Sequence, residues 1–233
     1  MKLLLVSATG TPHFEHCKKE LQKFLMGTKT VGFVSAANLF DEWKYFNLMR
    51  ERLVSSRIVA NLLHVTCDQE GIDTLARIDS VIVGGGNTYA LLKRMRESGI
   101  LRRLAERMLE GMLYVGSSAG ANAAGPNILT TNDWNVVGLT DFQSFGFVPF
   151  NINPHYVEKG SSDAPHSETR DQRINEFHQV WRNPVIALEE TTLLLVEDQT
   201  ISIRGSGVAK VFVKDRPSRQ LSPNDQLSFN DLT

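Results

Sequence analysis

An apolar run that ends in a tight glycine turn is encoded by residues 113–122, LYVGSSAGAN. The run suits a strand that is buried on both faces, and the small residues after it suit a sharp turn into a helix. Similar apolar runs recur at residues 3–6, 31–34, 58–65 and 80–83. Between these runs, apolar residues recur at helical spacing, as Leu91, Leu92 and Met95 do. This alternation predicts a parallel sheet flanked by helices.

The pattern changes roughly halfway along the chain, where glycine, proline and asparagine are scattered through a long stretch that reaches His155. A polar segment, residues 158–168, follows it. Both stretches predict loops, which often carry functional residues. A helix is expected over residues 169–180, because apolar residues there recur at helical spacing, and its N-cap would be Thr169 or Ser167.

The last part of the chain contains short apolar runs joined by tight turns. The runs are residues 185–188, 193–196, 200–203 and 208–213. They predict strands added antiparallel to the sheet edge, followed by a polar tail after Pro217. The expected fold class is therefore α/β, with a mostly parallel sheet flanked by helices and antiparallel strands near the C-terminus. Residues 1–233 are expected to form a single domain, since the sequence contains no repeat or low-complexity linker.

Composition excludes several classes of function. The 233 residues carry a formal net charge of −1, which gives no excess basic field for holding a nucleic-acid backbone. No apolar run approaches the length of a transmembrane segment, and residues 3–6 are too few for a signal-peptide core. Two cysteines, Cys17 and Cys67, make neither a disulfide framework nor a four-ligand zinc site. We therefore expect a cytoplasmic protein without a nucleic-acid or membrane partner and without a metal.

The serine of the G-x-S-x-G motif, Ser118, is the strongest candidate for chemistry. It directly follows a predicted strand and precedes a helix start, which is the context that the motif requires. A turn built from small residues lets the hydroxyl project while backbone amides at the helix start face the same space. Those amides can stabilise an oxyanion. A small-residue turn that only packs a helix on a sheet is the alternative interpretation of these five residues.

A glycine loop, residues 84–88 with the sequence GGGNT, follows another predicted strand and opens another helix. It should lie at the same carboxyl edge as Ser118, where open α/β sheets bind ligands. It has neither the Gly-Lys-Ser/Thr ending of a Walker loop nor the third glycine of a dinucleotide-binding motif. We therefore expect it to present a backbone amide, the second oxyanion donor beside the Ala119 amide. A flexible strand-to-helix turn is the alternative.

A serine hydroxyl becomes a strong nucleophile only when a base removes its proton. His155 is the predicted base because it lies in the loop region after the sheet, and His166 is the reserve. The third member of a triad would be Glu189 or Glu190, which follow a predicted strand; adjacent residues there point in opposite directions, so only one can face the site. The order Ser, His, Glu differs from that of α/β-hydrolases and argues against an esterase or lipase.

Five motifs together resemble the peptidase E family of α-aspartyl dipeptidases. They are residues 83–88 (VGGGNT), 116–122 (GSSAGAN), 130–133 (TTND), 152–155 (INPH) and 168–173 (ETRDQR). The matches run in order from about residue 3 to residue 215. The resemblance implies a flavodoxin-like, glutamine-amidotransferase-like fold. It also implies hydrolysis of dipeptides that begin with aspartate, without a cofactor.

The resemblance also implies roles for individual residues. These are Ser118 as nucleophile, His155 as base, Glu190 as acid, and the amides of Gly86 and Ala119 as oxyanion donors, with Gly85 a weaker candidate. Family members have a proline before the glutamate where this chain has Glu189, so a shift of one residue stays open. They often carry an aromatic residue before the serine, where this chain has Ser117, so substrate packing there is expected to differ.

The side chain of an N-terminal aspartate needs a local cation in a protein of nearly neutral charge. Arg170 lies in the 168–173 motif, and a guanidinium binds a carboxylate through two parallel hydrogen bonds. The alternative is an exposed arginine that pairs with a neighbouring carboxylate at a helix start. Lesser candidates for binding the substrate's amine or backbone, each of which could equally cap a helix or turn, are Asn87, Asn132 and Asp133.

Two other functions stay open. A related hydrolase similar to cyanophycinase would cleave at aspartyl residues of a branched polymer and would need a longer groove. A non-catalytic binder of a small acidic ligand would keep the fold, although it has no need for a serine, a histidine and a carboxylate together. These patterns make no prediction of the oligomeric state.

Overall fold

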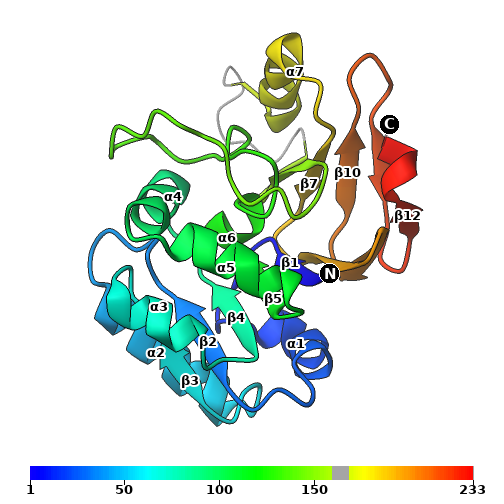
Figure 1. Cartoon of the computed structure of the whole chain (residues 1–233). Coiled ribbons are helices and arrows are strands. Elements are labelled where there is room, and N and C mark those ends of the chain that lie inside the picture. Colours follow the sequence, from blue (N-terminus) through cyan, green and yellow to red (C-terminus); the bar gives the residue numbers. More distant parts are fainter. Residues whose placement is uncertain (159–167, 233) are drawn as a thin grey trace.

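The computed structural model describes residues 1–158 and 168–232. Five parallel strands form one side of its main sheet, in the spatial order β3 (Leu62–His64), β2 (Val31–Val34), β4 (Ser80–Val83), β5 (Leu113–Ser117) and β1 (Lys2–Val6), with β3 at the edge (Figure 1). The first four follow the order 2-1-3-4 of flavodoxin-like sheets, and the N-terminal strand takes the fifth place. The expected parallel sheet is confirmed, although only three residues of the run 58–65 form a strand.

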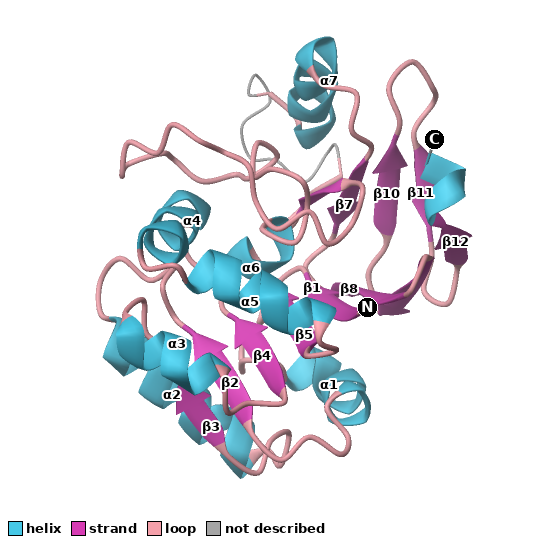
Figure 2. Cartoon of the chain, viewed as in Figure 1, coloured by secondary structure: helices cyan, strands magenta, loops and turns pink. Residues whose placement is uncertain are grey.

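The apolar runs form strands because both of their faces are buried. In β1, Leu3 and Leu5 face one hydrophobic core, and Leu4 and Val6 face the other. The second core is covered by the 3₁₀ turn η1 (Glu15–Cys17) and by helices α1 (Lys18–Phe24) and α2 (Glu42–Ser55). The first is covered by α3 (Gln69–Leu75), α4 (Thr88–Glu97), α5 (Ile100–Leu109) and α6 (Ala119–Asn122) (Figure 2). Helices on both faces leave only the strand ends open for a site.

Three antiparallel strands extend the main sheet beyond β1. They are β8 (Thr192–Glu197), β9 (Thr200–Gly205) and β12 (Gln226–Ser228), each paired antiparallel with its neighbour. The predicted antiparallel strands near the C-terminus are therefore confirmed. The expected polar tail is wrong, because β12 and the 3₁₀ helix η2 (Phe229–Leu232) bury Leu227 and Leu232 against the core.

Two runs that were expected at the edge of the main sheet lie in a second sheet. Its order is β11 (Arg219–Leu221), β10 (Ala209–Phe212), β7 (Val185–Leu188) and β6 (Asn151–Asn153). Ile186 and Leu188 of β7 face the main core, whereas Val185 and Ala187 pack against helix α7 (Arg170–Val180). The run in β7 is continuously apolar because both faces are covered, and such a run does not indicate which sheet it joins.

Helix α7 begins where the sequence predicts. The Thr169 hydroxyl accepts the Gln172 N–H, and the Gln172 side chain accepts the Thr169 N–H, which forms a capping box. The alternative cap, Ser167, lies outside the described residues. Within the described part of the chain, the helices lack the length and apolar character that crossing a bilayer requires.

Candidate active site

A sharp turn between β5 and α6 presents Ser118 at the carboxyl edge of the sheet. Its backbone has φ 51° and ψ −109°, a conformation that is rare for a residue with a side chain. A Cβ at Gly116 would lie 2.4 Å from the Gly120 carbonyl oxygen, and a Cβ at Gly120 would lie 2.2 Å from the Val83 carbonyl oxygen. The two glycines of the motif therefore permit a turn that a side chain at either position would block.

Ser118 and His155 are in direct contact. Ser118 Oγ lies 2.9 Å from His155 Nε2. The backbone N–H of His155 donates to Ser7 Oγ at 2.9 Å, and that hydroxyl donates to the Leu188 carbonyl at 2.9 Å. These bonds tie the histidine loop to the ends of β1 and β7. The structure thus brings the predicted nucleophile and base together, while the reserve His166 lies outside the described residues.

Of the two adjacent glutamates after β7, Glu190 is the one near the histidine. Glu190 Oε1 lies 3.3 Å from His155 Nδ1. The Glu189 carboxylate instead accepts the backbone N–H of Val208 at 3.0 Å. The Glu190 side chain is 69% exposed, so water screens its attraction to the imidazole. This geometry lets Glu190 orient the ring and leaves Glu189 in a backbone-binding role.

The glycine loop after β4 lies beside the serine. A Cβ at Gly85 would lie 3.0 Å from Ser118 Cβ, and a Cβ at Gly86 would lie 2.4 Å from the Ala37 carbonyl oxygen. Gly86 also has a φ of 132°, which favours glycine. Among the hydrogen bonds within residues 1–158 and 168–232, none uses the N–H of Gly86 or of Ala119. The role of these two amides as donors to an oxyanion at Ser118 stays a prediction.

An open cleft of about 660 Å³ lies over Ser118, His155 and Glu190. Its other walls are the loop after β1, Asn38, Tyr45 and the glycine loop. Burial raises the pKa of Tyr45, and a hydrogen bond from the Gly85 backbone partly opposes that rise.

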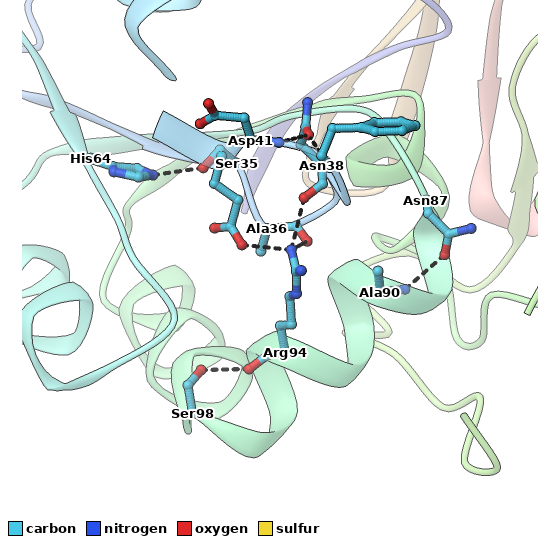
Figure 3. Close-up of polar contacts among 11 residues, drawn as sticks. Ser35, Ala36, Asn38, Asp41, His64, Asn87, Ala90, Arg94 and Ser98 are labelled. Carbon is cyan, nitrogen blue, oxygen red and sulfur yellow. Dashed lines mark hydrogen bonds and ion pairs between the residues drawn. The ribbon is translucent and has the colours of Figure 1, made fainter. Parts of the chain in front are cut away.

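One wall of the cleft is held by Arg94, a residue that the sequence did not single out. Figure 3 shows its guanidinium aimed from α4 at the loop that follows β2. It donates to the carbonyl oxygens of Ala36 and Asn38 at 2.9 Å each and to the Glu42 carboxylate at 2.6 Å. The same loop contains Ala37, against which Gly86 packs. An arginine inside a helix gives no local sequence signal of such a role.

Arg170 lies at the start of α7 and lines a small hollow of about 40 Å³. Asn132 and Asn153 line the same hollow, and Asn132 Nδ2 donates to the carbonyl of Pro154, the residue before His155. Burial lowers the pKa of Arg170, and repulsion from Arg173 adds to this effect. A guanidinium partly removed from water attracts an anion more strongly than an exposed one does.

Asn87 and Asp133 hold the start of α4 instead of lining the cleft. Asn87 Oδ1 accepts the Ala90 N–H at 2.9 Å, and its Nδ2 donates to the Trp134 carbonyl at 2.9 Å. Asp133 Oδ2 accepts the N–H of Thr88 at 2.7 Å and its hydroxyl at 2.6 Å. These are capping contacts. Their roles as substrate ligands stay predictions.

Comparisons with known proteins point to one family. The sequence matches the model of peptidase family S51 over residues 3–204. It is 36% identical to a probable alpha-aspartyl dipeptidase of Drosophila melanogaster, over 97% of this chain and 96% of that protein. It is 35% identical to peptidase E of Streptomyces coelicolor, over 98% and 94%. A peptidase structure from an acI-B1 Actinobacterium shares the fold, with a TM-score of 0.75 at 16% identity over 97% and 96% of the chains.

Proposed function

The chain belongs to peptidase family S51, and we propose that it is a serine exopeptidase that hydrolyses dipeptides with an N-terminal aspartate. The observation that carries this proposal is the line of contacts from Ser118 Oγ through the His155 imidazole to the Glu190 carboxylate. The names of its relatives, α-aspartyl dipeptidase and peptidase E, support the choice of substrate. The proposed reaction uses no metal or organic cofactor, and residues 1–233 act as one peptidase domain.

The reaction proceeds through an ester on the serine. Ser118 Oγ attacks the carbonyl carbon of the aspartyl residue while His155 Nε2 takes the hydroxyl proton. The amides of Gly86 and Ala119 bind the resulting oxyanion. His155 then gives the proton to the leaving nitrogen, the C–N bond breaks, and the second amino acid departs. A water molecule deprotonated by His155 hydrolyses the ester, which restores Ser118 and releases aspartate.

Glu190 acts on the histidine and does not contact the reacting bond. Its carboxylate accepts a hydrogen bond from the N–H at His155 Nδ1, so the lone pair of Nε2 faces Ser118. The same carboxylate stabilises the imidazolium that forms during attack. Because the carboxylate is largely exposed, its contribution is smaller than that of a buried triad acid.

Glu190→Gln is expected to lower kcat by roughly 10²-fold, less than the loss of about 10⁴-fold that an amide causes at a buried triad acid. The matched control is Glu189→Gln, which keeps an oxygen able to accept the Val208 N–H and should change kcat by less than about threefold. Steady-state kinetics on Asp-Leu would check both. The reverse pattern, with the loss in the Glu189 variant alone, would assign the acid to Glu189.

Substrate preference follows from the cation at the start of α7. In the proposed complex, Arg170 binds the side-chain carboxylate of the substrate's aspartate through two parallel hydrogen bonds. A neutral side chain of similar size, such as asparagine, would leave the half-buried guanidinium without an anion. The enzyme therefore selects aspartate over asparagine by charge and not by shape.

A panel of peptides tests the proposed function. We expect Asp-Leu to be cleaved to free aspartate, with kcat/KM at least about 100-fold above that for Asn-Leu. The panel also contains β-Asp-Leu, longer peptides that begin with aspartate, and a branched aspartyl polymer. Cleavage confined to the polymer would favour the cyanophycinase-like hydrolase. Binding of aspartate without turnover of any peptide would favour the non-catalytic binder.

A further inference from the structure

We propose that Lys210, Tyr156 and Asp171 are positioning residues that hold the substrate-binding Arg170 in place relative to the base His155. The three side chains, with Glu158, are called the Lys210 cluster below. The inference rests on the proposed function and deepens it. It concerns how one site aligns the residue that binds the substrate with the residue that moves the proton.

The cluster joins three separate segments of the chain through short contacts. Lys210 Nζ, on β10, lies 2.8 Å from Asp171 Oδ2, 3.2 Å from Tyr156 Oη and 3.1 Å from Glu158 Oε1. Tyr156 Oη donates to Asp171 Oδ1 at 2.6 Å. Each oxygen of the Asp171 carboxylate therefore has its own donor, and a carboxylate held at both oxygens cannot rotate without losing a hydrogen bond.

The residues that directly follow His155 and Arg170 in the chain both belong to the Lys210 cluster. Tyr156 follows His155, and its N–H donates to the Leu188 carbonyl at 2.8 Å. The residue is 2% exposed, and it packs in the apolar core beneath α7. Asp171 follows Arg170 in the first turn of α7. Consecutive Cα atoms lie only about 3.8 Å apart, so moving Asp171 or Tyr156 also moves Arg170 or His155.

Charge and burial make this cluster different from a surface ion pair. The Lys210 side chain is 13% exposed. Burial by itself would lower the pKa of Lys210, but hydrogen bonds with Asp171, Tyr156 and Glu158 raise it above the ordinary value. Burial, followed by the hydrogen bond to Asp171, raises the pKa of Tyr156. The lysine is therefore a cation and the tyrosine a neutral donor at neutral pH, and removing the cation takes the 2.8 Å ion pair away from the partly buried Asp171 carboxylate.

Catalysis makes this alignment matter. The substrate's carboxylate must meet Arg170 while its peptide carbonyl meets Ser118 and His155, and a displacement of about 1 Å can cost on the order of 10²-fold in rate. A cluster that acts through Arg170 should affect only substrates that use Arg170. A cluster that merely stabilises the fold should affect all substrates alike.

The test combines two substitutions with two substrates. Wild type, Lys210→Met, Arg170→Met and the double variant are assayed on Asp-Leu and Asn-Leu, with products followed by mass spectrometry. Lys210→Met should lower kcat/KM on Asp-Leu by about 10- to 30-fold and leave Asn-Leu within about threefold. In the Arg170→Met background it should have almost no further effect. Lys210→Arg, which keeps the cation, should recover most of the activity.

Two further variants, one control and one substitute, accompany this test. Lys2→Met removes an exposed lysine paired with Glu197 and should leave kcat/KM unchanged. Tyr156→Phe removes one hydroxyl and keeps the apolar core; it replaces Lys210→Met if that variant does not fold, and should also reduce kcat/KM on Asp-Leu selectively. Melting temperatures of all variants report on stability.

If Lys210→Met lowered kcat/KM equally on Asp-Leu and Asn-Leu, the proposal would be overturned. It would also be overturned if Lys210→Met lowered kcat/KM by the same factor in the Arg170→Met background as in wild type. Either result would mean that the cluster only stabilises the fold. Failure of the proposed function has a different signature, because wild type would then leave Asp-Leu intact. If only the positioning role is wrong, wild type still hydrolyses Asp-Leu and still prefers it to Asn-Leu.

Discussion

Ser118→Ala is expected to lower kcat for hydrolysis of Asp-Leu by on the order of 10⁶-fold, the loss that follows removal of a triad nucleophile. The physical reason is that the alanine variant has no oxygen to form the ester, and His155 then has no hydroxyl to deprotonate. Substrate binding should be little changed, because the cleft, the glycine loop and Arg170 remain. Initial rates of aspartate release, with enzyme purified free of host peptidases, would measure the loss.

The matched control is the adjacent serine. Ser117 is fully buried and does not line the cleft, contrary to the expected role in substrate packing, and its hydroxyl has no hydrogen-bond partner within the described residues. Ser117→Ala should therefore change kcat by less than about threefold and leave stability the same or slightly higher. Retention of more than a few per cent of Asp-Leu hydrolysis in Ser118→Ala would contradict the assignment of the nucleophile and require another route to the products.

Arg170→Met is expected to lower kcat/KM for Asp-Leu by about 10²- to 10³-fold, since truncating one partner of a buried, hydrogen-bonded charge pair costs about 2–5 kcal/mol. Asn-Leu, whose first side chain is uncharged, should be cleaved at nearly its former rate. The preference for aspartate would then almost disappear, and this change in ratio distinguishes a binding role from general damage. Parallel kinetics on the two peptides would measure it.

Arg173 provides a control in the same hollow. It lies one turn further along α7, and its Nε is 3.7 Å from the Glu168 carboxylate, with the arginine side chain 53% exposed. Arg173→Met should lower kcat/KM for Asp-Leu by less than about tenfold, because an exposed charge is screened by water. A large loss in this variant with none in Arg170→Met would move the carboxylate-binding role to Arg173.

Features that depend on neighbours in the chain could be predicted from the sequence. Position 120 must be glycine because the turn brings its backbone against β4. Five consecutive residues encode the turn itself. The cap of α7 follows in the same way, since Thr169 and Gln172 satisfy each other's backbone groups within one helical turn. The burial of β1 on both faces is visible as an unbroken apolar run.

Features that depend on contacts across the fold could not be predicted. The sequence left Glu189 and Glu190 as alternatives for the acid, and only the pairing of β7 with β10 and the path of the histidine loop separate them. Asn87 has a side chain that could bind a substrate, yet it caps α4 in the structure. Lys210 carried no signal at all, because its three partners lie far from it in the chain.

The sequence by itself determined a parallel α/β sheet, a sharp serine turn at its carboxyl edge and a helix over about residues 169–180 with Thr169 or Ser167 as its cap. Steric and hydrogen-bonding preferences within a few residues are sufficient for these features. Tertiary structure decided that β7 and β10 form a second sheet, that Glu190 faces His155, and that Lys210 joins the base loop to α7. Such contacts depend on strand pairing and on the burial of charge between distant segments, which the whole fold determines.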